Sequence, residues 1–441
     1  MHKLVLVLAD VTIIIAAYVV SLLLRFQRVM HVAEHQWFTL IFFLLLIPCV
    51  FYIYDLYNHL FYVQRLRVFY RIIKSWLIIS TTYVVIGFLT KFAFLIESRI
   101  FIASFFAILL FLLFFVRVLL LKKILECYFS DPARRIQCKY VGPTHMRKTC
   151  TVFLSENVVA GLTIMNHDKL PKSDTDSTEV FLYTEAKEYS ELYKDIKHNI
   201  SSACKLHAAS QLFNKLKLGW EWCNIGSALV YTIRKKEDQF FRNYIRRLID
   251  IVGSILGLVI LAPIFLVIGI AIKLNSRGPA IYRQKRCGKN GGEFILYKFR
   301  SMYDSKGSNG AQLIENDYLN KTTPKKEIVD HGRITSIGRI LRKTSIDEWP
   351  QFINVLRGDM NLVGPRPSLP NEVKYYKNWH RDRLSVKQGL TGLWQIYGRG
   401  EMPGDKSIFL DLLYVINRSL SLDIKLLVET IPAVILGRGA Y

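Results

Sequence analysis

Long apolar runs dominate the first third of the chain. They cover residues 4–24, 37–54, 76–90 and 100–121, and a run of about 20 apolar residues can cross a bilayer as a helix. The pattern predicts four transmembrane helices. Asp10 lies inside the first run, and we interpret it as a polar packing residue rather than a proton site. Arg117 lies near the end of the fourth run, where its long side chain can extend to the bilayer surface.

Basic residues around these runs predict their orientation. The segments after the second and fourth runs are the most basic, with Arg65, Arg67, Arg71, Lys74, Lys122 and Lys123. Cytoplasmic loops are enriched in Lys and Arg. We therefore expect the N-terminus and everything after residue 123 to lie in the cytoplasm.

A fifth apolar run, residues 251–272, has a proline near its centre. Pro263 removes a backbone hydrogen bond and kinks a helix. The flanks are basic on both sides, with Arg246, Arg247, Lys273 and Arg277. We expect a re-entrant helix at about residues 248–274, which enters the membrane, bends at Pro263 and returns to the same face. An ordinary fifth transmembrane helix is the alternative.

Residues 126–235 alternate short β-branched runs with polar stretches. IQCKYVG, VVAGLTI and EVFLYTEA predict strands, and KEYSELYKDIKHNI predicts an exposed helix. This alternation is typical of a small α/β, Rossmann-like domain with a parallel sheet. A dinucleotide site needs the fingerprint GxGxxG after the first strand, and only Gly142 is found there. Scaffolding, dimerisation or regulation suits this segment better than cofactor binding.

The chain is thus predicted to have three domains. Residues 1–125 form a four-helix transmembrane region, and residues 126–235 form a cytoplasmic α/β domain. Residues 236–441 form an α-rich α+β monotopic domain that contains the re-entrant helix.

Composition narrows the partners of the chain. Of its 441 residues 51% are hydrophobic and 21% are charged, and the formal net charge is +24. This positive charge suits nucleotides, phosphates or anionic lipid headgroups. The sequence has no zinc-finger spacing, RNA-binding aromatic motif or DNA-binding helix pair, so nucleic acid is not expected. The seven cysteines form no CxxC motif, which fits a reduced chain that faces the cytosol.

Two short motifs in the last third carry candidate chemistry. In GDMNLVGPRP, prolines on both sides of Arg366 restrict the backbone around one guanidinium, which favours bidentate binding of a phosphate. In TSIDEWPQ, Asp347 and Glu348 stand side by side. Taken alone, this stretch also fits a helix start, because Ser345 and Glu348 match a capping box and Pro350 is tolerated in the first turns.

From about residue 241 to 441 the chain resembles the catalytic domain of the monotopic phosphoglycosyl transferases, the bacterial sugar transferase family. The resemblance rests on the basic-flanked apolar run with its central proline, and on SRGP, YKFRSM, LRKTSIDEWPQ, GDMNLVGPRP, GLTGLWQIYGR and the terminal GRGAY. The preceding spans and α/β segment resemble the large form of the family. Its members include the initiating hexose-1-phosphate transferases of O-antigen and exopolysaccharide assembly.

The resemblance implies a two-step reaction. In the family, a carboxylate attacks the β-phosphate of a UDP-sugar, releases UMP and holds the sugar phosphate covalently; polyprenyl phosphate, usually undecaprenyl phosphate, then accepts it. Asp347 is thereby implied as the nucleophile and Glu348 as a ligand of Mg²⁺. The cations implied to bind substrate phosphate are Lys298, Arg342, Arg366 and Arg399. The resemblance also implies a bacterial inner membrane location with the catalytic domain on the cytoplasmic face, and it is compatible with a homodimer.

Physical chemistry agrees with two separate roles for the acid pair. Successive helical residues point about 100° apart, so these carboxylates cannot share one proton as a facing pair would. A helix N-terminus stabilises ionised carboxylates, and Mg²⁺ binds one or two carboxylates together with phosphate oxygens. Two alternatives remain: a non-catalytic membrane scaffold for polysaccharide assembly, and a nucleotide-sugar epimerase built on the middle segment. No motif identifies the sugar, and UDP-glucose and UDP-galactose are the first donors to test.

Overall fold

The computed structural model describes residues 2–26, 34–90, 99–165, 179–201, 203–216, 218, 223–234, 240–303, 334–398 and 404–435. The chain divides into two compact units. The first consists of Met1–Asp174, Thr178–Tyr183 and Trp220–Tyr231, and the second of Thr175–Ser177, Thr184–Gly219 and Thr232–Tyr441. The predicted three-domain boundaries remain a prediction.

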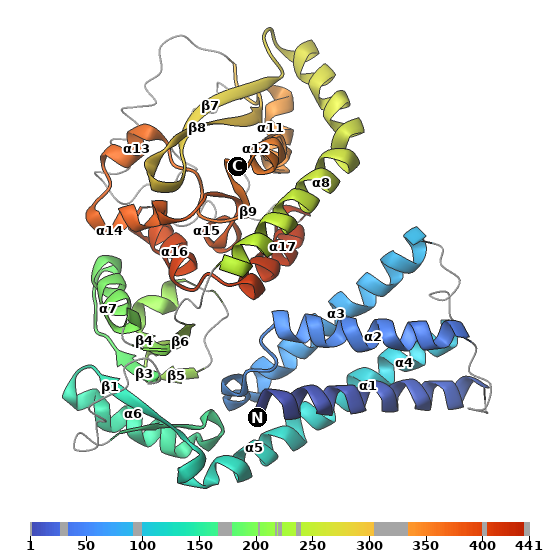
Figure 1. The fold of residues 1–441 in the computed structure, drawn as a ribbon, viewed down its shortest axis with the longest axis vertical. Helices are drawn as coiled ribbons and strands as arrows, with labels where there is room; N and C mark the ends of the chain where they lie inside the picture. Colours follow the sequence, from blue (N-terminus) through green and yellow to red (C-terminus); the bar gives the residue numbers. More distant parts are fainter. Residues whose placement is uncertain are drawn as a thin grey trace. The chain divides into compact units, whose positions relative to one another are not determined.

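Four apolar helices open the first unit, as predicted (Figure 1). They are α1 (His2–Phe26), α2 (Glu34–Ile53), α3 (Arg65–Thr90) and α4 (Arg99–Leu113), and α4 continues through the π-helix η3 (Phe114–Leu120) into α5 (Leu121–Ser130). By length and composition, α1, α3 and the α4–α5 segment can each cross a membrane, whereas the apolar part of α2 is shorter. The third helix begins earlier than expected. The basic residues from Arg65 to Lys74 lie in its first turns, because Arg and Lys are good helix formers.

A buried ion pair joins the first and last of these helices. Asp10 and Arg117 are both fully buried, and Arg117 Nε donates to Asp10 Oδ1 over 2.8 Å. Arg117 Nη1 donates to Leu56 O at 2.8 Å and to Tyr62 Oη at 2.6 Å. Arg117 therefore does not extend to the bilayer surface as predicted, because its charge is balanced inside the bundle. Asp10 has the packing role that its position suggested.

The middle of the chain contributes a mixed sheet with the strand order β2-β1-β3-β4-β6-β5. In the first unit, β1 (Ile136–Val141) pairs in parallel with β2 (Leu162–Ile164) and with β3 (Glu179–Tyr183), as the sequence predicted. The helix α6 (Thr144–Glu156) connects β1 and β2. An antiparallel hairpin of β5 (Cys223–Ile225) and β6 (Ala228–Arg234) was not predicted.

The second unit begins with α7 (Tyr189–Ser201) and β4 (Lys205–Ser210). The helix predicted here is present, and its charged side chains Glu191, Lys194 and Lys197 are exposed as expected. It is not exposed all round, because Leu192, Tyr193 and Ile196 form a buried face. Tyr193 Oη and Lys197 Nζ both donate to the carboxylate of Asp382, over 2.7 and 2.5 Å. These two bonds attach α7 to the C-terminal part of the same unit, at Asp382.

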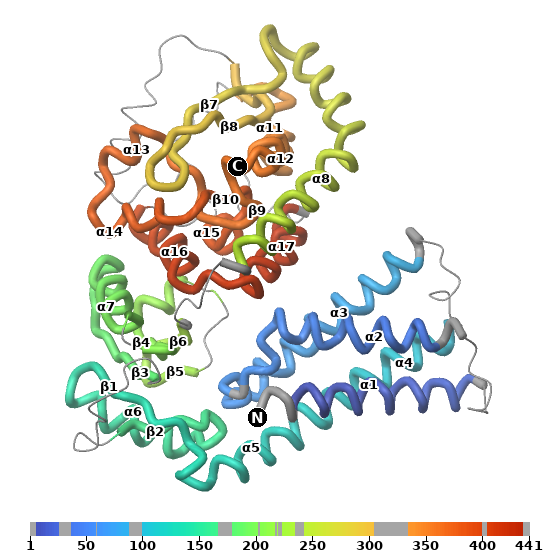
Figure 2. The backbone as a smooth tube through the Cα atoms, viewed as in Figure 1, coloured from blue at the N-terminus to red at the C-terminus, as the bar shows by residue number. Residues whose placement is uncertain are grey.

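A long helix, a hairpin and a group of shorter helices make up the rest of this unit (Figures 1 and 2). The helix is α8 (Phe240–Asn275), and β7 (Ile281–Cys287) and β8 (Glu293–Phe299) form an antiparallel hairpin. The short strands β9 (Asn361–Val363) and β10 (Gly389–Thr391) pair in parallel. The remaining elements are α11 (Ser336–Lys343), η10 (Ile346–Glu348), α12 (Gln351–Arg357), α13 (Pro370–Lys374), α14 (Asn378–Arg381), η11 (Asp382–Ser385), α15 (Leu393–Tyr397), α16 (Asp405–Ile416) and α17 (Leu420–Ile435).

The two ends of α8 are bonded to this body. Near its start, Arg247 donates to the carbonyls of Val355 and Leu356 at the end of α12, both over 2.7 Å. At its end, Arg300 donates to the carbonyls of Ser276 and Arg277, again over 2.7 Å. Carbonyls at a helix C-terminus lack intrahelical donors, so a guanidinium there satisfies two of them at once.

The middle of α8 is apolar and exposed. Only 6% of its most apolar stretch is buried inside the protein. The exposed side chains there include Leu256, Val259, Ile260, Leu266 and Val267. Figure 1 shows α8 as one continuous helix that curves along its length. Pro263 lies inside this helix, within the exposed stretch.

Candidate active site

An open cleft of about 690 Å³ lies in the second unit. Its lining comes from the hairpin, from α11, η10 and α12, from the loop after β9, and from β10 and α15. Five of the six residues that the sequence suggested as catalytic or phosphate-binding line it: Lys298, Arg342, Asp347, Glu348 and Arg366. The sixth, Arg399, lies outside the described residues. Residues 68 positions apart in sequence, from Lys298 to Arg366, are therefore brought to one cavity.

The acid pair lies on a 3₁₀ turn rather than on the start of an α-helix. Ser345 has φ of +59° and makes no side-chain cap hydrogen bond, so the predicted capping box is wrong. A capping serine needs an extended backbone, whereas Ser345 is left-handed because α11 ends immediately before it and the chain must turn. Glu348 N instead donates to Ser345 O over 3.2 Å, and α12 begins only at Gln351.

This turn keeps the two carboxylates apart in direction. A 3₁₀ helix has about three residues per turn, so successive side chains point about 120° apart. Both nevertheless line the cleft. The two acids can therefore contact different parts of one substrate.

Glu348 is bonded to one of the predicted cations. Lys298 Nζ donates to Glu348 Oε1 over 2.9 Å, and both side chains are mostly buried. A carboxylate has about four lone-pair positions, so a carboxylate that accepts a hydrogen bond from a lysine can bind a metal ion as well. Mg²⁺ prefers oxygen ligands and takes one or two carboxylates with phosphate and water. The carboxylate oxygens of Asp347 and Glu348 are suitable ligands for such an ion.

Arg366 projects from a loop whose backbone is held along its length. The carbonyls of Pro365, Arg366, Pro367 and Ser368 accept hydrogen bonds from Gly389 N, Arg383 Nη2, Arg286 Nη1 and Cys287 N, over 2.8, 2.9, 3.0 and 2.8 Å respectively. The guanidinium of Arg366 lies over the ring of Trp394, 5.1 Å from its centroid. An arginine on a fixed backbone and an aromatic face can bind phosphate with less loss of side-chain freedom.

Sequence reasoning missed Arg286, Gln351, Trp394 and Gln395, all of which line the cleft. Arg286 belongs to β7 of the hairpin and is buried. Burial lowers its pKa to about 10, with the positive charge of Arg366 adding to the effect. Its position before the turn GKNGG was visible in the sequence, but its inward direction was not.

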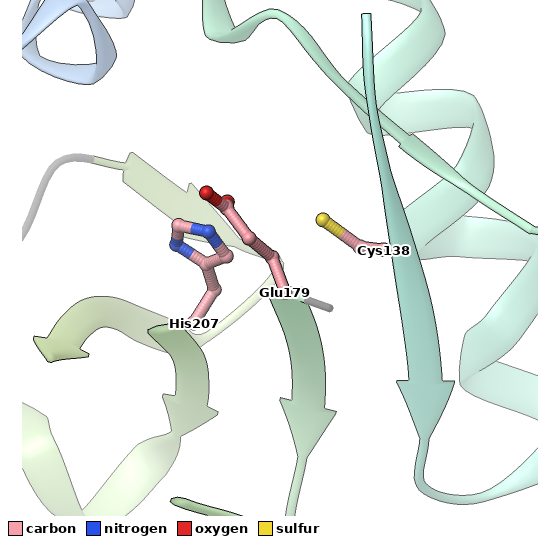
Figure 3. Close-up of side chains that lie close together, drawn as sticks. All are labelled: Cys138, Glu179 and His207. Carbon is pink, nitrogen blue, oxygen red and sulfur yellow. The ribbon is translucent and has the colours of Figure 1, made fainter. Parts of the chain in front are cut away.

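A second group of polar side chains lies in the sheet and not in this cleft. Figure 3 shows Cys138 on β1, Glu179 on β3 and His207 on β4, all buried. His207 Nδ1 lies 2.9 Å from Thr232 Oγ1. A structural zinc site has four ligands, and only these three residues gather in the described part of the sheet. We interpret them as buried polar residues of the sheet.

Comparison with known proteins concerns the same part of the chain. Residues 241–437 match the family described as bacterial sugar transferase. The undecaprenyl-phosphate galactose phosphotransferase of Salmonella typhimurium is 40% identical over 200 residues, which are 45% of this chain and 42% of that protein. The UDP-glucose:undecaprenyl-phosphate glucose-1-phosphate transferase of Klebsiella pneumoniae is 40% identical over 204 residues, 44% of this chain and 41% of that protein.

A shorter relative is covered almost completely. The exopolysaccharide production protein ExoY of Sinorhizobium fredii is 37% identical over 202 residues, which are 44% of this chain and 88% of that protein. The matched region thus spans less than half of the Salmonella and Klebsiella proteins and most of ExoY.

Proposed function

The chain belongs to the bacterial sugar transferase family, and on this basis we propose that it transfers a sugar-1-phosphate from a UDP-sugar to a polyprenyl phosphate, with release of UMP. The observation that carries the proposal is the cleft in which Asp347 and Glu348 meet Lys298, Arg342 and Arg366. A scaffold that only recruits other proteins would not need two acids and three cations in one cavity. The similarity to two proteins whose names describe undecaprenyl-phosphate sugar-phosphate transferases also favours an enzyme over a scaffold.

Asp347 is the nucleophile in this proposal. Its carboxylate attacks the β-phosphorus of the UDP-sugar, and the bond between that phosphorus and the bridging oxygen breaks, so UMP leaves with the electron pair. The phosphate oxygen of polyprenyl phosphate then attacks the same phosphorus, releases Asp347 and forms a polyprenyl-diphosphate sugar. The cations of the cleft stabilise the charge on the phosphate oxygens during both steps.

Glu348 would hold Mg²⁺ together with substrate phosphate oxygens, and the ion would supply positive charge beside the diphosphate. Lys298 orients Glu348 through their ion pair. Arg366 binds phosphate from the loop after β9. The product initiates assembly of an O-antigen, capsule or exopolysaccharide at the cytoplasmic face of the inner membrane.

Replacement of the nucleophile tests the chemistry. We expect Asp347→Asn to lower UMP release from UDP-glucose or UDP-galactose by about 10³-fold or more, because the amide is a poor nucleophile. A donor labelled in the β-phosphate should leave label on the wild-type chain and none on the variant. Glu293→Gln is the matched control, since Glu293 is an exposed acid of the same unit outside the cleft. Full UMP release by Asp347→Asn would overturn the assignment.

Removal of divalent cations tests the role of Mg²⁺. We expect a chelator to stop UMP release and added Mg²⁺ to restore it, while binding of the nucleotide weakens because its diphosphate charge is no longer balanced. Undiminished turnover in excess chelator would remove the metal from the proposal and leave the role of Asp347 to its own test.

We also propose that α8 is re-entrant and that the middle sheet is Rossmann-like but binds no dinucleotide. Support for a re-entrant α8 comes from the bonds of Arg247 and Arg300, which attach both of its ends to one body. Support for the sheet assignment comes from the parallel strands β2, β1 and β3, and a nicotinamide cofactor bound to the purified chain would contradict it.

A further inference from the structure

Arg383 is a buried arginine that touches the loop of Arg366 without lining the cleft. It lies in η11, 17 residues after Arg366, and is 7% exposed. Its Nη2 donates to Arg366 O over 2.9 Å, and its Nη1 donates to Tyr376 Oη over 2.8 Å. Tyr376 Oη in turn lies 2.6 Å from Ser368 Oγ. One guanidinium therefore supports the loop directly at residue 366 and, through Tyr376, at residue 368.

The charge of Arg383 is balanced from inside the fold. Asp411 of α16 is 1% exposed, and its Oδ2 lies 2.6 Å from Arg383 Nη2. A buried ion pair is seldom more stable than a well-packed apolar pair of the same volume, because both charges lose their hydration. Fold stability alone therefore gives little reason for this pair. A guanidinium whose Nη2 donates to the carbonyl of Arg366, and whose Nη1 holds the same loop through Tyr376, gives one.

We propose that Arg383, held by Asp411, is a positioning residue that directs Arg366 toward the phosphate groups of the substrate. The inference rests on the proposed function, since it assigns Arg366 to substrate phosphate. A displacement of about 1 Å in a binding group can cost about 10²-fold in rate. Loss of the Arg383 fork should therefore affect phosphate binding even though Arg383 never contacts the substrate.

The test removes both charges together, so that no unpaired charge remains in the core. In the full-length chain, Arg383→Met with Asp411→Leu should raise the Kd of UDP about 10-fold to 100-fold, measured by calorimetry in detergent. The control is Arg246→Met with Asp423→Leu, a second buried pair of the same unit, with Nε and Oδ2 2.5 Å apart and no bond to the loop. We expect the control to lower Tm and to leave the Kd of UDP within about two-fold.

A cycle with Arg366 separates positioning from general damage. If Arg383 acts through Arg366, the double substitution should add no further loss of UDP affinity in an Arg366→Ala background. Equal losses with and without Arg366, or an unchanged Kd in the wild-type background, would overturn the inference.

Failure of the proposed function gives a different result. A chain that binds UDP and shows the expected cycle but releases no UMP from any UDP-sugar would contradict the proposed reaction and keep the role of Arg383. A chain that releases UMP, but in which the losses from the Arg383/Asp411 and Arg366 substitutions simply add, would keep the proposed reaction and overturn the role of Arg383. A wild-type chain that binds neither UDP nor pyrophosphate would overturn both.

Discussion

Asp411 links the stability of the chain to pH. Burial raises its pKa to about 6, and the positive charge of Arg383 and the backbone of Arg366 oppose the rise. In the unfolded chain an aspartate titrates near pH 3.9. Between these values the native state binds a proton that the unfolded state does not. The stability that Asp411 contributes is therefore fully present below about pH 4 and is lost as the pH rises through 6.

The variant Asp411→Asn should lack this dependence. We expect the free energy of unfolding of the wild type, minus that of the variant, to fall by up to about 3 kcal/mol between pH 4 and pH 7, which corresponds to two pKa units. Denaturant unfolding at a series of pH values measures it. A difference that stays constant across this range, or that grows with pH, contradicts the raised pKa.

The residues that line or support the cleft differ in how far the sequence could predict them. Asp347, Glu348 and Arg366 stand in short motifs whose chemistry is local, so the sequence indicated them. Arg286 and Arg383 act through bonds to Pro367 and Arg366, respectively 81 and 17 residues away in the chain. Nothing in the sequence near either arginine predicts which backbone carbonyl accepts its hydrogen bond. Such roles depend on tertiary packing, which spacing does not encode.

Among the elements, α8 likewise has features that the sequence predicted and features that it did not. Its apolar run and Pro263 were predicted, because composition and proline chemistry are local. Its start at Phe240, and the two arginines that bind helix ends, were not predicted. The hydrogen bonds of Arg300 depend on Gly278, which has φ of +117° and whose added Cβ would lie 2.1 Å from Arg300 Nη1. The turn after α8 thus leaves room for the guanidinium only because this residue has no side chain.

Gly278→Ala should displace Arg300 from the end of α8. We expect a loss of about 2–4 kcal/mol in the free energy of unfolding, made up of about 1–2 kcal/mol for the left-handed alanine and the rest for the unpaired guanidinium and carbonyls. Gly291→Ala is a matched control, because Gly291 also has a positive φ, of +80°, but open space around it. Thermal unfolding of both variants measures the difference, and equal losses would show that the contact with Arg300 is unimportant.

For the molecule in its membrane, the decisive matter is where the ends of α8 lie. The part of α8 from Arg242 to Asn275 has 34 residues, which is about 51 Å of helix at about 1.5 Å per residue, and a bilayer core is only about 30 Å thick. A straight crossing would therefore carry one end well out of the far side. Yet Arg247 and Arg300 attach opposite ends of α8 to the same body, near α12 and after β8. One body cannot lie on both faces of a bilayer, so a straight crossing would break one of these attachments.

Cysteine labelling distinguishes the two arrangements. In a chain without native cysteines, Tyr244→Cys and Tyr282→Cys probe the two flanks of α8, since both side chains are exposed. We expect an impermeant maleimide to label both in inverted membrane vesicles and neither in intact spheroplasts. His31→Cys, between the first two predicted spans, is the opposite control and should label only in spheroplasts. Labelling of positions 244 and 282 from different faces would establish an ordinary span. Labelling of both from one face would mean that α8 enters and leaves the membrane on the same side, as a re-entrant helix does.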